Sequence, residues 1–106
     1  MSEANFQKKI IKYLEEIGAY VFKHNASAIS KAGVPDIICC YKGLFIGIEV
    51  KKDNKSKPTE LQKYNLNKIN KCGGVGIVLR PDKFELFKEL IKGLEKVRIV
   101  REIGVE

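Results

Sequence analysis

Residues 33–52 read GVPDIICCYKGLFIGIEVKK and contain two apolar runs joined by Lys42-Gly43. A two-residue link that contains glycine, placed between runs rich in β-branched and aromatic residues, predicts a β-hairpin. We expect strands over 36–41 and 44–52. Asp36 begins the first of these strands, and Glu49 and Lys51 lie toward the end of the second. These charged residues in otherwise apolar strands require an explanation.

The hairpin would bring the charged residues together at one end of the sheet. Side chains alternate between the faces of a strand, so Glu49 and Lys51 point the same way, and antiparallel pairing places Asp36 beside them. Two neighbouring carboxylates repel each other unless a cation lies between them. Mg²⁺ takes such oxygen ligands and keeps water molecules that can act as nucleophiles, while a lysine can stabilise charge on a phosphate. The alternative is a surface salt bridge at a strand end, which contributes little to stability.

The rest of the chain alternates between helical and extended patterns. Glycine, proline and capping residues mark the ends of the elements. We expect a helix over 3–17 ended by Gly18, a strand over 19–24, a helix from Pro58-Thr59-Glu60 to Cys72, a strand over 75–79, a helix from Pro81-Asp82 through Leu94, and an edge strand within 97–105.

This order predicts an α/β fold with a mixed β-sheet flanked by helices. The pattern is αβββαβ followed by a C-terminal helix, and the strand–helix–strand unit implies one parallel pairing. A length of 106 residues fits a single domain over 1–106. The sequence has neither a secretory signal pattern nor an apolar run long enough to cross a bilayer, so we expect a cytoplasmic protein without a membrane partner. The three cysteines lack metal-site spacing, which favours reduced core residues.

Three polar residues fall on helix faces that should point inward. Glu3 and Gln7 share the apolar stripe of the first predicted helix, and Gln62 lies on that of the second. A carboxylate or amide in such a position needs a polar partner. The alternatives are an acid that stabilises the start of the first helix and a glutamine at the rim of the core.

Basic residues are concentrated after Lys51. Of the net charge of +7, residues 51–71 carry +5, from seven lysines and two acidic residues. Such a segment favours binding to a polyanion, because neutralising phosphates releases counterions. A solvated helix face is the alternative. The candidate contacts to DNA phosphates are Lys31, Lys52, Lys55, Lys57 and Lys63. We expect His24 to have a structural role.

The motif Gly33-Val34-Pro35-Asp36, followed by Glu49-Val50-Lys51 and by Thr59-Glu60-Leu61-Gln62, resembles the VRR-NUC family of the PD-(D/E)XK nuclease superfamily. The likeness is to its small stand-alone phage and bacterial members, and it extends from Glu3 to about Leu79. It implies a restriction-endonuclease-like core that hydrolyses DNA with Mg²⁺ or Mn²⁺ and no small-molecule cofactor. Asp36, Glu49 and Glu3 would bind the metal, Lys51 would be the catalytic lysine, and Gln62 would support the site.

The resemblance also bears on substrate and assembly. Similar proteins, including archaeal Holliday-junction resolvases, act as homodimers on branched DNA, and a phage-encoded member would act inside its host cell. Relatives often have a second glutamate where this chain has Gln7. A non-catalytic DNA-binding module on the same fold is therefore the alternative, and a protein-interaction domain is a third possibility. We expect the dimer surface in 97–105 and on the apolar face of the last helix.

Overall fold

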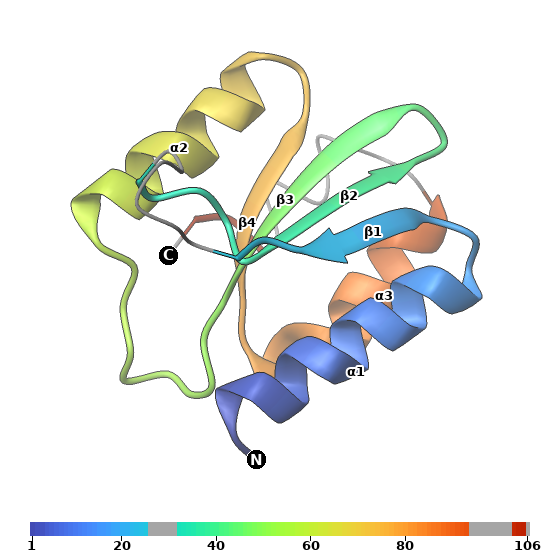
Figure 1. Ribbon diagram of the computed structural model, residues 1–106, viewed down its shortest axis with the longest axis horizontal. Helices are drawn as coiled ribbons and strands as arrows, with labels where there is room; N and C mark the ends of the chain where they lie inside the picture. The colour runs from blue at the N-terminus through green and yellow to red at the C-terminus, as the bar shows by residue number, and fades with distance from the viewer. Residues whose placement is uncertain (26–31, 94–102, 106) are drawn as a thin grey trace.

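The structure is a computed structural model that describes residues 1–25, 32–93 and 103–105 (Figure 1). Its elements follow the predicted order. They are α1 (Glu3–Glu16), β1 (Tyr20–Lys23), β2 (Ile37–Tyr41), β3 (Leu44–Val50), α2 (Glu60–Lys71), β4 (Val75–Leu79), a 3-10 turn η1 (Pro81–Lys83) and α3 (Phe84–Gly93). Leu94, at the predicted end of the last helix, lies outside the described residues. None of the described helices is long and apolar enough to cross a membrane.

The predicted hairpin is confirmed. β2 and β3 pair antiparallel, with Tyr41 opposite Leu44 and Ile37 opposite Ile48. Lys42 and Gly43 connect the two strands with φ angles of 50° and 80°. Positive φ at both residues is what a tight turn needs to match the twist of the strands, and glycine adopts it at little cost.

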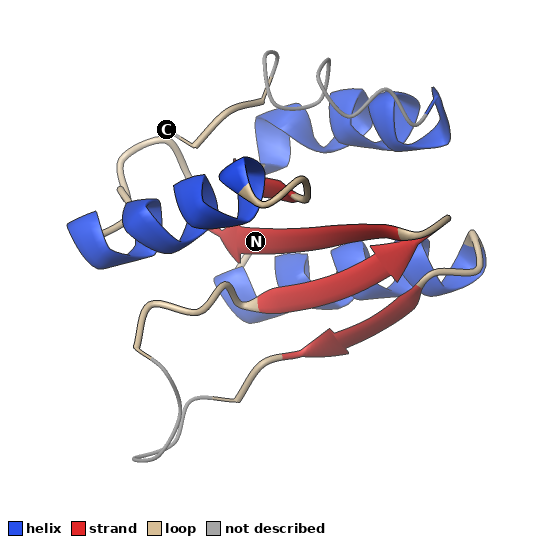
Figure 2. Cartoon of the chain, turned by 90° about the horizontal axis from the view of Figure 1, so that it is seen from above, coloured by secondary structure: helices blue, strands red, loops and turns tan. Residues whose placement is uncertain are grey.

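The four strands form one mixed sheet in the order β1-β2-β3-β4 (Figure 2). β1 pairs antiparallel with β2, whereas β3 and β4 run parallel and are connected through α2. The predicted fold class, a mixed sheet with flanking helices, is confirmed.

Helices cover the two faces of the sheet unequally. α1 and α3 lie together on one face, where Ile46, Ile48 and Val50 point into the main core (Figure 1). α2 packs on the other face, over β3 and β4. It lies so close that a Cβ atom on Gly76 would be 2.4 Å from the backbone oxygen of Leu66. β1 and β2 have little helical cover on this second face.

The edge of β4 that faces away from β3 forms hydrogen bonds to groups that do not belong to a strand. The side chain of Asn70 donates to the Gly76 carbonyl at 3.0 Å and accepts from the Gly76 N–H at 2.7 Å. The N–H of Val78 donates to the carbonyl of Gly104 at 3.2 Å. Residues 103–105 thus contact this edge without strand structure, and residues 97–102 of the predicted edge strand lie outside the described residues.

Two expectations from the sequence are wrong. The apolar face of α3 is not available for a dimer, because Phe87, Leu90 and Ile91 are buried in the core. All three cysteines are free, but only Cys39 is a core residue, since Cys40 and Cys72 are exposed. The sequence pattern shows that a face is apolar but not which element covers it.

Candidate active site

Asp36 and Glu49 meet where β2 begins and β3 ends. The register that pairs Ile37 with Ile48 continues by one residue to place Asp36 opposite Glu49. The Oδ2 atom of Asp36 accepts a hydrogen bond from the N–H of Val50 at 2.8 Å, and the Asp36 carbonyl accepts one from the N–H of His24 at 2.7 Å. Backbone groups of both neighbouring strands therefore hold Asp36, and His24 contributes its backbone to this arrangement.

Glu49 is a buried acid beside a second acid. Its exposed fraction is 2%. Burial, then the negative charge of Asp36 and a hydrogen bond between the two carboxyl groups, raise the pKa of Glu49 to about 8. The raised pKa favours the protonated form of Glu49 near neutral pH while no cation lies beside it.

Lys51 supplies the positive charge of the site. Its Nζ atom lies 3.6 Å from Oε2 of Glu49, and only 14% of its side chain is exposed. The Lys51 N–H donates to the carbonyl of Leu79 at 3.1 Å, so the parallel pairing of β3 with β4 fixes its backbone. Lys51 opposes the pKa rise of Glu49 but is outweighed by burial and Asp36. The sequence prediction that Asp36, Glu49 and Lys51 converge is confirmed by this geometry.

The two carboxyl groups are suitable ligands for a hard divalent cation. Such an ion would take the place of the proton they hold, and its positive charge would relieve their repulsion. Among residues 1–25, 32–93 and 103–105, no three or more His, Cys, Asp or Glu side chains are grouped to hold a metal ion. Asp36 and Glu49 thus provide two acidic ligands, and no third His, Cys, Asp or Glu of the described residues is grouped with them.

Comparison with known proteins agrees with this geometry. The family described as archaeal Holliday junction resolvase (hjc) matches residues 3–74, which include all of the motif residues described above. The chain belongs to this Holliday junction resolvase family. It is therefore a member of a family of nucleases that act on DNA.

This family member is also similar to solved structures of VRR-NUC domains, as the sequence motifs predict. One structure, a VRR_NUC domain, is 27% identical with a TM-score of 0.69 and covers 87% of this chain and 96% of its own. Another, a VRR_NUC domain protein, is 21% identical with a TM-score of 0.67 and covers 99% of this chain and 95% of its own. Comparison with curated proteins gave no match.

Two of the polar residues that the sequence predicts on an inward helix face, Glu3 and Gln7, lie on α1 of this resolvase family member. Glu3 is the first residue of α1, is partly exposed, and follows the N-cap Ser2, whose side chain accepts from the Asn5 N–H at 3.1 Å. The structure does not group Glu3 with the two acids of the strands. Gln7 is buried on the inner face of α1, as its spacing predicts.

Gln62 forms part of a helix cap. Its Oε1 atom accepts from the N–H of Thr59 at 2.8 Å, and Oγ1 of Thr59 accepts from the N–H of Gln62 at 3.1 Å. This reciprocal pair is a capping box, which satisfies two backbone donors at the start of α2. The structure thus gives the carbonyl oxygen of Gln62 a local partner, and the sequence signal for it is Thr-x-x-Gln after a proline.

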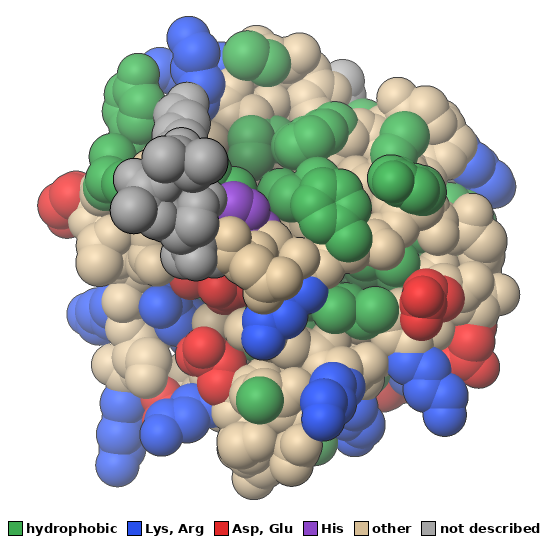
Figure 3. Space-filling model, in the orientation of Figure 1, with side chains coloured by type: hydrophobic (Ala, Val, Ile, Leu, Met, Phe, Trp, Pro, Cys, Tyr) green, Lys and Arg blue, Asp and Glu red, His purple; other side chains and the backbone are tan. Residues whose placement is uncertain are grey.

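The basic segment begins directly after the site. Lys52, Lys55 and Lys57 are exposed on the loop between β3 and α2, whereas Lys63 pairs with Glu60 at 3.0 Å. Lys31 lies outside the described residues. Figure 3 shows positively charged side chains gathered at this loop, at the lower left.

Arg80 orders this loop, a role that sequence reasoning missed. From the end of β4 it donates to the carbonyls of Asp53 and Ser56 at 3.0 and 2.9 Å. The Oδ1 atom of Asp53 accepts from the N–H groups of Lys55 and Ser56, both at 2.9 Å, and these bonds lower the pKa of Asp53. The one sequence signal for Arg80 is its place between a strand and Pro81.

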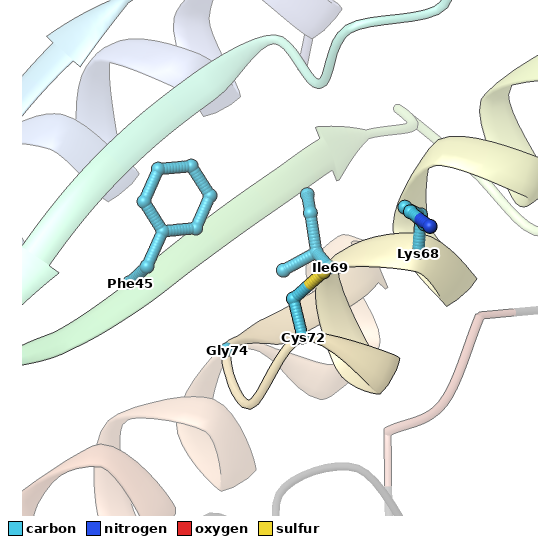
Figure 4. A pocket seen from close by; sticks show the side chains of 5 residues that line it. All are labelled: Phe45, Lys68, Ile69, Cys72 and Gly74. Carbon is cyan, nitrogen blue, oxygen red and sulfur yellow. The ribbon is translucent and has the colours of Figure 1, made fainter.

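A second missed feature is the open part of the sheet. Tyr20, Phe22 and Phe45 share one face and have exposed fractions of 76%, 47% and 45%. We call these residues, with Ile38 and Cys40, the open sheet face; with Cys39 they line an apolar hollow of about 320 Å³. Phe45 also borders a pocket of about 200 Å³ against Ile69 and Cys72 of the α2 end (Figure 4). The open sheet face therefore continues toward α2.

Proposed function

We propose that the protein is a Mg²⁺- or Mn²⁺-dependent endonuclease that hydrolyses phosphodiester bonds in branched DNA such as Holliday junctions. The observation that carries this proposal is the convergence of Asp36, Glu49 and Lys51. Membership of the resolvase family supports both the chemistry and the substrate class.

Each residue of the site has a distinct proposed task. Asp36 and Glu49 would hold the cation, with Asp36 oriented by the Val50 N–H. When bound, the ion supplies an activated water and neutralises charge on the phosphate. Lys51, held beside Glu49, would orient the attacking water or stabilise negative charge that develops on the phosphate.

Two further residues keep their proposed supporting roles. Glu3 would approach the site from the first turn of α1 as a third acid when metal and DNA are bound. Gln62 would act indirectly, because its oxygen caps α2 and so fixes the start of the helix that packs over β3 and β4.

DNA binding would depend on the basic loop next to the site. Lys52, Lys55 and Lys57 are exposed there, and the loop backbone is held by Arg80. Ordered lysines beside the scissile position would contact phosphates without reading bases. Lys63 would contribute if DNA displaced its Glu60 partner, and Lys31 remains a candidate.

A homodimer would use the open sheet face. The face combines exposed aromatic side chains with an apolar hollow, and the alternative surface on α3 is buried. Large exposed apolar patches on a small domain are typical of interaction sites. A two-fold pair would present two active sites to the two strands of a symmetric junction.

The second candidate is a DNA-binding module that does not cut. It is favoured by the finding that, among the described residues, two rather than three acids gather at the site. In that case the lysines alone would account for DNA binding.

A cleavage assay separates the two candidates. The protein is incubated with a four-way junction or a matched duplex, with Mn²⁺ or with EDTA, and the products are resolved on a denaturing gel. We expect cutting of the junction with Mn²⁺, and none with EDTA or with Asp36→Ala. Junction binding without cutting under every condition would favour the binding module, and preferential cutting of the duplex would contradict the branched substrate.

A further inference from the structure

Asn65 is a buried polar residue on the inner face of α2, with an exposed fraction of 6%. Its Nδ2 atom donates to the carbonyl of Leu61 at 2.9 Å, one turn earlier in the helix. It also donates to the carbonyl of Ala32 at 3.3 Å, across 33 residues of sequence. An amide nitrogen carries two N–H groups, and each is costly to bury without an acceptor. The second bond therefore ties α2 to the segment that leads into β2.

Gly33 packs against the same asparagine. Its φ angle of 79° is in the left-handed region that favours glycine. A Cβ atom on Gly33 would be 2.7 Å from Nδ2 of Asn65 and 2.8 Å from Cγ of Leu61. The chain thus touches α2 at this point and has no room for a larger residue.

Pro35 makes the next contact, with the sheet. A Cβ atom on Gly47 would be 3.0 Å from Cγ of Pro35 and 2.8 Å from Cδ1 of Ile69, so a proline and a second α2 side chain lie against the same face of β3. Gly47 precedes Glu49 by two residues and shares its strand face. The ring fixes the φ angle of Pro35, which leaves the chain little freedom directly before Asp36.

The segment from Ala32 to Asp36 is therefore held at both ends. α2 holds its start through Asn65, and the hairpin holds its end through the bond from the Val50 N–H to the Asp36 carboxylate. Figure 1 shows this segment between α2 and the start of β2. Because the two anchors are close in sequence, a shift at the first moves the carboxylate at the second.

We propose that Asn65 is a positioning residue of the active site, which pins the segment before Asp36 to α2 and so sets where the Asp36 carboxylate lies beside Glu49. It acts through Asp36 and not by touching the ion or DNA. Its effect on cleavage rests on the proposed function, whereas its effect on the placement of Asp36 does not.

The test compares two asparagines of the same helix. Asn65→Ser keeps a hydroxyl that can donate to the carbonyl of Leu61, four residues earlier, but its shorter side chain does not reach Ala32. Asn70→Ser is the matched control, because the side chain of Asn70 bonds the backbone of Gly76 on the edge of β4 that faces away from the site.

Hydrogen exchange of the Val50 N–H, measured by NMR without divalent ions, reports the bond to Asp36. We expect exchange at this N–H, relative to other β3 amides, to be about tenfold faster in Asn65→Ser, the factor that corresponds to loss of a hydrogen bond to a charged group. Asn70→Ser should leave it unchanged. In single-turnover cleavage of a four-way junction with Mn²⁺, Asn65→Ser should cut about 10²-fold more slowly, as expected for a reacting group displaced by about 1 Å. It should bind the junction as the wild type does.

A pair of glycine variants tests the same contact if Asn65→Ser does not fold. Gly33→Ala pushes a methyl group against Asn65, whereas a Cβ atom on Gly43, at a similar φ of 80°, meets no described atom within 4 Å. Both changes strain the backbone alike. Only Gly33→Ala should speed exchange at the Val50 N–H and slow cleavage.

Two outcomes separate this inference from the proposed function. If the wild type cuts the junction, but exchange at the Val50 N–H changes equally in Asn65→Ser and Asn70→Ser and equally in Gly33→Ala and Gly43→Ala, the positioning role is refuted and the nuclease stands. If the wild type cuts no DNA, but exchange rises only in Asn65→Ser and Gly33→Ala, the nuclease is refuted and the placement of Asp36 by Asn65 stands.

Discussion

The N–H of Val50 donates a 2.8 Å hydrogen bond to the carboxylate of Asp36, across fourteen residues of sequence. This bond orients one acid by the backbone of the strand that carries the other. Orienting Asp36 with a backbone N–H costs little additional conformational entropy, because the sheet has already fixed the backbone of Val50. The site is therefore built into the hairpin and does not depend on mobile side chains from loops.

Asp36→Asn should lower the pKa of Glu49 from about 8. The substitution removes the negative charge beside Glu49 but leaves an oxygen that can still accept from Val50. The measurement is an NMR titration of the Glu49 side-chain carboxyl without divalent ions. An unchanged pKa would show that burial alone accounts for the shift.

Glu49→Gln should increase stability over the wild type, and increasingly so as pH rises. The folded-state pKa of Glu49 is raised from 4.5 to about 8, so between these values the native protein binds more protons than the unfolded chain. The contribution of Glu49 to stability is therefore present below pH 4.5 and is lost as pH rises through 8. Urea unfolding in EDTA at several pH values measures the difference. A difference that is constant with pH would contradict the raised pKa.

Lys51→Met should reduce cleavage by about 10²–10³-fold, the cost typical of losing one electrostatic group at a reacting centre. Junction binding should change little, because one charge among many is lost. The same variant should raise the pKa of Glu49 further, since Lys51 lowers it. Single-turnover cleavage with Mn²⁺ and a binding assay separate the two effects. Equal losses in binding and cleavage would instead indicate a phosphate contact.

Replacing Lys52, Lys55 and Lys57 together by glutamine should reduce the salt dependence of DNA binding. If each lysine contacts one phosphate, the slope of the logarithm of the DNA-binding constant against the logarithm of salt concentration should become less steep by about 2.7. The matched control replaces the exposed Lys8, Lys9 and Lys12 of α1, which changes net charge equally. Equal effects from both triple variants would show that overall charge, and not the basic loop, controls binding.

Phe45→Glu should convert a dimer into monomers, because it places a charge on the open sheet face at a residue that lines both apolar pockets. Sedimentation velocity measures the mass in solution, and Asn5→Glu introduces the same charge on the exposed side of α1. A wild-type protein that sediments as a monomer at high concentration would refute the dimer. A dimer that persists in Phe45→Glu would place the interface elsewhere.

The sequence by itself determined the local features of the protein. Glycine and capping residues fixed the ends of α1 and α2, and Lys42-Gly43 fixed the register of the hairpin. Strand alternation and that register were sufficient to bring Asp36 to Glu49 and Lys51. These features depend on φ preferences and on a repeat of two, both of which are properties of neighbouring residues.

Only the tertiary structure decided which apolar faces are covered. α3 turned its apolar side to one face of the sheet, and on the other face α2 packs over β3 and β4 while Tyr20, Phe22 and Phe45 stay exposed. The same packing buried Glu49 and raised its pKa, and it left the side-chain oxygen of Gln7 without a hydrogen-bond partner among the described residues. Periodicity shows that a face is apolar or that an acid points inward. What lies against it depends on elements distant in sequence, so burial and desolvation follow from the assembled fold.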